Sequence, residues 1–118
     1  MRQRALGRTG EDLAAAFLEG EGMIVLERNF RCQQGEIDII ARDGGTIVFV
    51  EVKARRTLAL GSPLEAVTRA KLKTIRMVSG VWLRQQIEFY PSTRIDAIGI
   101  VMEPEPDYSH RRNVQVDW

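Results

Sequence analysis

Two apolar runs joined by a pair of glycines constrain this chain most: residues 35–42 (GEIDIIAR) and 46–55 (TIVFVEVKAR), linked by DGGT at 43–46. Adjacent glycines between apolar runs favour a two-residue type I′ turn, which needs positive φ at both central positions. Such a turn pairs Asp43 with Thr46 and sets the register of both strands. We therefore expect an antiparallel hairpin, with residues 46–55 as a central strand.

Four charged residues interrupt these runs: Glu36, Asp38, Glu51 and Lys53. In the expected register Asp38 faces Glu51 and Glu36 faces Lys53, with opposite Cβ atoms about 4.5–5.5 Å apart. Strand alternation puts all four on one face. Two carboxylates in apolar surroundings repel each other, and Mg²⁺ or Mn²⁺, which prefer oxygen ligands, would remove that repulsion. The alternative is an exposed face with a Glu36–Lys53 pair and no chemistry.

The rest of the chain predicts further helices and strands. We expect an α/β fold in which a mixed sheet is flanked by helices in the order α-β-β-β-α-β, within one domain spanning residues 1–118. Thr9 and Asp12 form a plausible N-cap pair for the first helix, and Ser62-Pro63 marks the start of the second. The expected elements are helices at 10–21 and 62–86, strands at 23–32, 35–42, 46–55 and 94–102, an acidic loop at 103–107, and an edge strand or tail at 113–118.

Composition narrows the functional classes. One cysteine and one histidine argue against a zinc site and for a reducing compartment. There is no apolar run of about 18 residues and no secretory signal, so we expect a cytoplasmic protein without a membrane span. Phe30, Phe49 and Trp82 are expected in the core rather than at a base-stacking surface.

Charge is clustered although the net charge is only +1. Residues 53–76 contain seven cations and one anion, Glu65. This segment predicts either a phosphate-binding face or a solvated helix flank, and both readings stay open. Glu11, on a flank of the first helix, adds a third acid that is either delivered to the metal or compensates the helix dipole.

Several motifs resemble a known nuclease superfamily. Asp38 and, after the hairpin, Glu51-Val52-Lys53 resemble the D…E-x-K core of the PD-(D/E)xK nucleases, although Ile37 replaces the proline of that pattern. Glu11 on an N-terminal helix is similar to archaeal Holliday-junction resolvases. The whole chain more closely resembles the bacterial YraN-type family of small candidate endonucleases, through GRTGEDLAAAFLEGEG, RNFRCQQGEIDIIARDGGTIVFVEVKARR, SPLEAVTRAKLKTI and RIDAIGI.

This resemblance implies a restriction-endonuclease-like fold and a role for each matching residue. Asp38 and Glu51 would ligate Mg²⁺ or Mn²⁺ with the Val52 carbonyl, and Glu11 would be an auxiliary ligand. Lys53 would orient or deprotonate the attacking water, or stabilise charge on the phosphate. The remaining matches are Arg55, Arg56 and Lys71 as nucleic-acid contacts, Arg94 and Asp96 as a structural pair, and Glu36 without a defined role.

The expected function is metal-dependent hydrolysis of DNA, at branched or otherwise structured sites. RNA stays open as a substrate. By analogy with enzymes that cut two opposed strands, a homodimer is expected. The alternatives are a non-catalytic nucleic-acid-binding module and an accessory protein in DNA repair, recombination or uptake.

Overall fold

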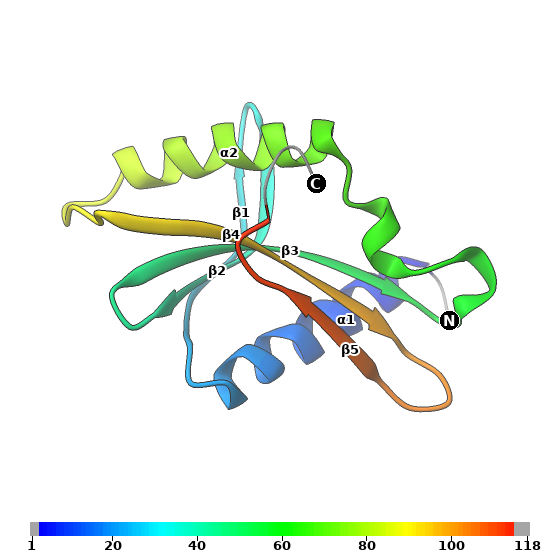
Figure 1. Cartoon of the computed structure of the whole chain (residues 1–118). Helices are drawn as coiled ribbons and strands as arrows, with labels where there is room; N and C mark the ends of the chain where they lie inside the picture. The colour runs from blue at the N-terminus through cyan, green and yellow to red at the C-terminus, as the bar shows by residue number, and fades with distance from the viewer. Residues whose placement is uncertain (1–2, 115–118) are drawn as a thin grey trace.

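The computed structural model describes residues 3–114 and has a five-stranded sheet between two α-helices (Figure 1). The strands lie in the order β1-β2-β3-β4-β5, with β3 and β4 parallel and every other neighbouring pair antiparallel. The predicted mixed α/β fold is confirmed. The elements are α1 (Gln3–Gly20), β1 (Ile24–Cys32), β2 (Gly35–Asp43), β3 (Thr46–Arg55), the 3-10 turns η1 (Leu58–Leu60) and η2 (Pro63–Ala66), α2 (Arg69–Arg84), β4 (Ser92–Val101) and β5 (Asp107–Arg111).

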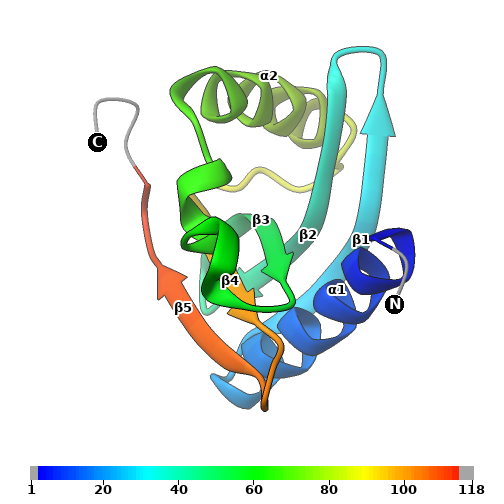
Figure 2. The ribbon, with the colours of Figure 1, turned by 90° about the vertical axis from the view of Figure 1, so that its right-hand side faces the viewer.

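The two helices cover opposite faces of the sheet, which gives three layers (Figures 1 and 2). The central strand β3 alternates between two cores: Val48 and Val50 pack under α1, whereas Ile47 and Phe49 pack under α2. The same alternation puts Glu51 on the α2 side of β3. Glu51 thus lies directly after Ile47 and Phe49 on the α2 side of this strand.

The β2–β3 hairpin has the predicted register. Its ladder runs from Asp43–Thr46 to Ile39–Val50. The predicted type I′ turn is wrong, because Gly44 has a positive φ of +60° and its neighbour does not. One positive φ at the first central position is typical of a type II′ turn, which also links two strands with two residues and keeps the same register.

Helix α1 begins at Gln3, earlier than predicted. Thr9 lies inside the helix, so the predicted N-cap pair with Asp12 is wrong; Asp12 instead accepts a hydrogen bond of 2.7 Å from Arg28. Gly10 has a packing role: a Cβ atom there would lie 2.7 Å from the Cβ of Ala54 on β3. The glycine that suggested a helix boundary therefore lets the helix approach the sheet.

The second helix begins later than predicted. Ser62 makes no side-chain cap, and the segment after it forms one 3-10 turn before the chain extends at the buried Val67. Thr68 is the N-cap of α2, and its Oγ1 accepts a hydrogen bond of 3.2 Å from the Lys71 backbone N–H. Burial of Val67 in the core interrupts the helical path that the sequence pattern suggested.

The fifth strand differs most from prediction. It covers Asp107–Arg111 and pairs with β4, whereas the edge strand was expected at 113–118. Residues 115–118 lie outside the described part of the chain. The predicted acidic loop at 103–107 is confirmed except for its last residue, which starts β5.

The three aromatic residues expected in the core are buried. Phe30, Phe49 and Trp82 are 8%, 1% and 3% exposed. Trp82 packs edge-on against Phe49, and its indole N–H donates to Glu27 Oε1 at 3.0 Å. No helix within residues 3–114 has both the length and the apolar character needed to cross a membrane.

Candidate metal centre

The candidate site lies where two neighbouring strands separate. Pairing between β2 and β3 ends at Ile39–Val50. One step further, Asp38 Oδ2 accepts a hydrogen bond of 2.8 Å from the backbone N–H of Val52. A side-chain oxygen here satisfies a donor that would otherwise pair with a strand carbonyl. The opened ladder therefore fixes the carboxylate of Asp38 in the gap between the strands.

Glu51 lies beside Asp38 and is 5% exposed. Its Oε2 is buried and has no hydrogen-bond partner among the described residues. Burial, followed by hydrogen bonding to Asp38 and the charge of Asp38, raises the pKa of Glu51 to about 8, while Lys71 and Lys53 act in the opposite direction. At neutral pH the Glu51–Asp38 pair thus holds a proton that a cation could replace.

Two cations lie on the same side of β3 as Glu51. Lys71 Nζ on α2 is 3.5 Å from Glu51 Oε2. Lys53, two residues after Glu51, is half-buried, and its positive charge lowers the pKa of Glu51. The predicted neighbourhood of Asp38, Glu51 and Lys53 is therefore present. Lys71, predicted as a nucleic-acid contact, lies closer to the acid pair than the sequence indicated.

Glu11 comes near this pair from α1. Burial and then the charge of Asp38 raise the pKa of Glu11, and its Oε1 is 4.0 Å from the guanidinium of Arg28. Across residues 3–114, however, no three His, Cys, Asp or Glu side chains form a set that could hold a metal ion. Asp38 and Glu51 are thus the two acids in contact, with Glu11 within electrostatic reach.

The predicted pairing of Glu36 with Lys53 is wrong. Glu36 lies opposite Arg31 of β1, with Arg31 Nε 2.9 Å from Glu36 Oε2. The reason is that the residues of β2 that precede Ile39 do not pair with β3. The end of the β1–β2 hairpin instead lies beside α2 (Figure 2), where Ile37 joins the α2 core. The four charges consequently do not share one face.

Two further cations follow the acid pair along the chain. Arg55 is half-buried, with an Nε that has no hydrogen-bond partner within the described residues. Arg56 is exposed. Both lie at or just beyond the end of β3, close in sequence to Lys53.

Arg94 and Asp96 form the predicted structural pair, but not as part of the acid centre. Asp96 neighbours Val50 across the β3–β4 ladder, so it faces α1, whereas Glu51 faces α2. Arg94 Nε is 2.9 Å from Asp96 and Arg94 Nη2 is 3.0 Å from Asp43. This cluster joins the hairpin turn to β4.

The sequence did not reveal two partners of Asp96. His110 Nε2 and the Asn113 backbone N–H each lie 2.9 Å from its carboxylate. Burial alone would raise the pKa of Asp96, but hydrogen bonds from His110, Arg94 and Asn113 together lower it. No local signal predicted this, because His110 belongs to the strand that was expected further along the chain.

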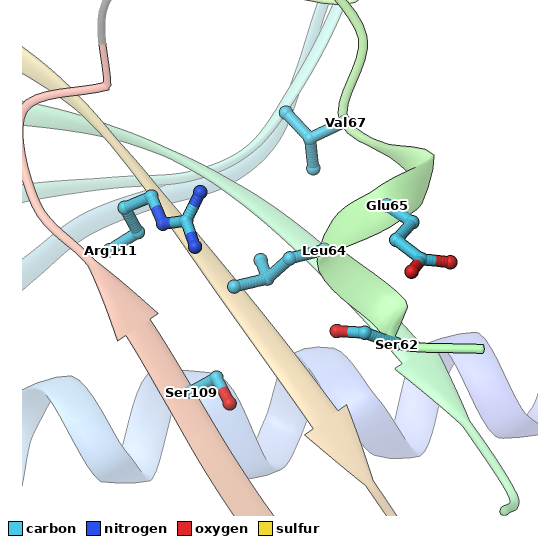
Figure 3. Close-up of a pocket in the computed structure, with 6 residues that line it drawn as sticks. All are labelled: Ser62, Leu64, Glu65, Val67, Ser109 and Arg111. Carbon is cyan, nitrogen blue, oxygen red and sulfur yellow. The ribbon is translucent and has the colours of Figure 1, made fainter. Parts of the chain in front are cut away.

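A pocket of about 580 Å³ lies apart from the acid pair, between η2 and β5 (Figure 3). The side chains of Leu64 and Arg111 point into it, while the carboxylate of Glu65 points away. None of its lining residues belongs to the predicted site. The pocket therefore adds no ligand to the acid centre.

Fold and site together define a small α/β protein whose central sheet carries a pair of acids, one buried and one half-buried, next to two lysines. The chain belongs to the uncharacterised protein family UPF0102, whose model matches residues 10–100. This confirms the YraN-type family predicted from the sequence motifs.

Relatives of similar length carry the same family name. A UPF0102 protein of Paenarthrobacter aurescens (strain TC1) is 48% identical over 111 residues, which cover 92% of each chain. A UPF0102 protein of Clavibacter michiganensis subsp. michiganensis (strain NCPPB 382) is 46% identical over 100 residues, or 85% of each chain. The family model thus covers strands β1 to β3, helix α2 and both acids of the pair.

Proposed function

We propose that this protein is a metal-dependent endonuclease that hydrolyses DNA phosphodiester bonds, with Asp38, Glu51 and Lys53 as the D…E-x-K core of a PD-(D/E)xK nuclease. The observation that carries the proposal is the buried Glu51 Oε2, which has no hydrogen-bond partner in the described chain and lies next to a second carboxylate. Such a group costs several kcal/mol unless a proton or a cation compensates it. A structural role alone gives no reason to keep it.

The residues present fit a hard divalent cation. Asp38 and Glu51 would hold Mg²⁺ or Mn²⁺, both of which prefer carboxylate and carbonyl oxygens. The Val52 N–H points at Asp38, and in an extended strand the C=O of the same residue faces the same side, so the Val52 carbonyl is a third candidate ligand. Glu11 would act through water, since no three-acid set forms within residues 3–114.

The side chains around the pair have distinct roles in this proposal. The bound cation would polarise a phosphoryl oxygen and lower the pKa of a water molecule. Lys53 would orient the attacking water or stabilise the charge that develops on the phosphate. Lys71, freed from Glu51 by the cation, would bind a neighbouring phosphate. Arg55 and Arg56 would extend that contact along the substrate.

The test is cleavage of plasmid, branched and nicked DNA with Mg²⁺ or Mn²⁺. Asp38→Asn, Glu51→Gln and Lys53→Ala should each abolish cleavage while the circular dichroism spectrum stays that of the parent. Glu36→Gln is the matched control, because Glu36 lies on the same hairpin but pairs with Arg31. Full activity in the three site variants would contradict the proposal.

The non-catalytic alternative is a nucleic-acid-binding module, which the cations of α2 favour. It requires salt-sensitive DNA binding in EDTA and no cleavage of any of these substrates with either metal. Parallel assays on RNA of the same sequence decide which nucleic acid is the substrate. Light scattering with and without DNA tests the expected homodimer.

A further inference from the structure

Helix α2 carries a row of exposed cations outside its buried face. Arg69, Lys73, Arg76 and Arg84 are exposed, and together with Gly80 they follow the i, i+4, i+7, i+11, i+15 spacing of one helix face. The sequence of α2 contains no acidic residue. At 1.5 Å per residue this basic row is roughly 22 Å long.

Helix α2 also contributes one cation to the acid pair. Lys71, in the first turn of α2, is the residue whose Nζ lies 3.5 Å from Glu51 Oε2. Arg69 and Lys73 lie two residues to either side of Lys71, and this spacing puts them on the opposite side of the helix. A strand that passes from the acid pair to the basic row would therefore cross the first turn of α2, which carries Lys71 on one side and Arg69 on the other.

The middle of the row is a glycine that a neighbouring cation covers. Gly80 has no side chain, and Arg84 Nη1 lies 3.3 Å from the place where its Cβ would be. The guanidinium of Arg84 thus lies over Gly80. A phosphate at this position would meet the guanidinium of Arg84.

The row ends at two exposed apolar side chains. Ile87 and Phe89, in the loop after α2, are 104% and 86% exposed. The next residue, Tyr90, stacks on buried Trp82 with ring centroids 6.2 Å apart. Tyr90 therefore anchors the loop, and Phe89 projects into solvent from a fixed base.

A single-stranded nucleic acid matches this order of groups better than an acidic protein would. Proteins bind single strands by cations that follow the phosphates and by aromatic rings on which bases stack. A fully paired duplex offers phosphates but no free base face to Phe89. The basic row therefore favours a polyanion as ligand, and the exposed ring of Phe89 favours a segment of that polyanion with unpaired bases.

We propose that α2 and its following loop bind an unpaired strand that extends from the cleavage site, with the basic row on successive phosphates and Phe89 stacked on a base. This inference rests on the proposed nuclease function for the direction of the strand. The substrate class that follows from this proposal is DNA with a single-stranded segment, such as a flap, gap or fork.

The first measurement is DNA binding without metal, by fluorescence anisotropy in EDTA at several salt concentrations. Replacing Lys73, Arg76 and Arg84 together by Gln should reduce the slope of log affinity against log salt by about 0.7 per lost cation on a single strand. Arg8→Gln removes an exposed cation from α1 on the opposite face and should leave the slope unchanged. An unchanged slope in the triple variant would contradict the proposal that the basic row binds phosphates.

The second measurement separates stacking from general apolar contact. Phe89→Ala should weaken binding to single-stranded and flapped DNA by roughly five- to a hundredfold, the range expected for one stacked base, with no change on blunt duplex. Phe89→Trp should restore the affinity and Phe89→Leu should not. Leu58→Ala is the matched control, since Leu58 is an exposed apolar residue elsewhere, at 64%.

Two results would reject the stacking role. The first is that Phe89→Ala weakens binding to single-stranded and duplex DNA equally. The second is that Phe89→Ala loses binding to phosphatidylserine-containing vesicles but keeps its binding to DNA. Because no hydrolysis is measured, these outcomes do not depend on whether the protein cleaves DNA. Conversely, a protein that binds as expected but never cleaves would reject the nuclease proposal alone.

Discussion

A carboxyl group with one buried, unbonded oxygen can lower its free energy by keeping a proton or by binding a cation. Glu51 is in that position, with Asp38 on one side and Lys71 Nζ at 3.5 Å on the other. The 3.5 Å contact is too long for a good hydrogen bond, so Lys71 compensates the charge only in part. At this scale the site is a competition between a proton, a lysine and a metal ion for one oxygen.

Metal affinity should therefore depend on pH. Because burial and Asp38 raise the pKa of Glu51 to about 8, binding of Mn²⁺ at lower pH must release a proton. We expect the association constant to rise about tenfold per pH unit from roughly pH 6 to pH 8 and then to level off. Calorimetry in buffers of different ionisation enthalpy measures both the affinity and the released proton.

Glu51→Gln should show no such dependence and little binding. A parent protein whose Mn²⁺ affinity is flat between these pH values would contradict a shared proton at the site. Lys71→Met should bind Mn²⁺ more tightly than the parent, because a competing cation is lost.

At the scale of elements, the buried Asp96 cluster joins three parts of the chain that are distant in sequence. Asp96 and Arg94 belong to β4, His110 to β5 and Asp43 to the hairpin turn. Asp96→Asn should destabilise the fold by about 3–5 kcal/mol in urea unfolding, since Arg94 and His110 lose their anionic partner in the interior.

The same cluster predicts a pH effect of known sign. The hydrogen bonds to Asp96 lower its pKa, so its stabilisation is present above its ordinary value of 3.8 and is lost as pH falls through the lower folded value. The Asp96→Asn variant should accordingly lose less stability than the parent on acidification. Equal acid sensitivity of the two proteins would count against this assignment.

Packing of α1 on the sheet depends on the absence of a side chain at one position. Gly10→Ala should destabilise by about 1–3 kcal/mol although alanine favours helix, because the new methyl would meet Ala54 Cβ at 2.7 Å. Gly20→Ala, with nothing within 4 Å of its would-be Cβ, is the control and should be neutral or stabilising. Thermal unfolding compares the two variants directly.

Local turn chemistry explains which elements were predictable. The two glycines set the β2–β3 register and so the proximity of Asp38 and Glu51, even though the turn type was predicted wrongly. The departure of β2 from β3 depends on Ile37 packing with α2, a contact between residues far apart in sequence. The predicted start of each helix is wrong for a similar reason. Gly10 and Val67 take part in tertiary packing, and this packing overrides the helix-boundary signals near them in the sequence.

At the scale of the whole molecule, the buried acid sets the pH dependence of stability in the absence of metal. The folded pKa of Glu51, about 8, lies above its ordinary value of 4.5. Its contribution is therefore fully present below pH 4.5 and is lost as pH rises through about 8. Glu51→Gln should match the parent near pH 4 and exceed it by up to about 5 kcal/mol at pH 9 in EDTA, given about 1.4 kcal/mol per pKa unit.

Denaturant titrations at both pH values test this, with the exposed Glu36→Gln as control. Added Mn²⁺ should raise the unfolding temperature of the parent and not that of Glu51→Gln, because a ligand stabilises the state that binds it. A variant less stable than the parent at pH 9 would show that ionised Glu51 supports the fold.

The glycine that lets α1 approach β3 immediately precedes Glu11, and this adjacency has a geometric consequence. A contact between a glycine and an alanine methyl determines how far the helix-borne acid lies from the one held between the strands. Enlarging either residue would move one charge relative to the other without altering any charge. The electrostatic spacing of this centre is thus governed by steric fit between two of the smallest residues in the chain.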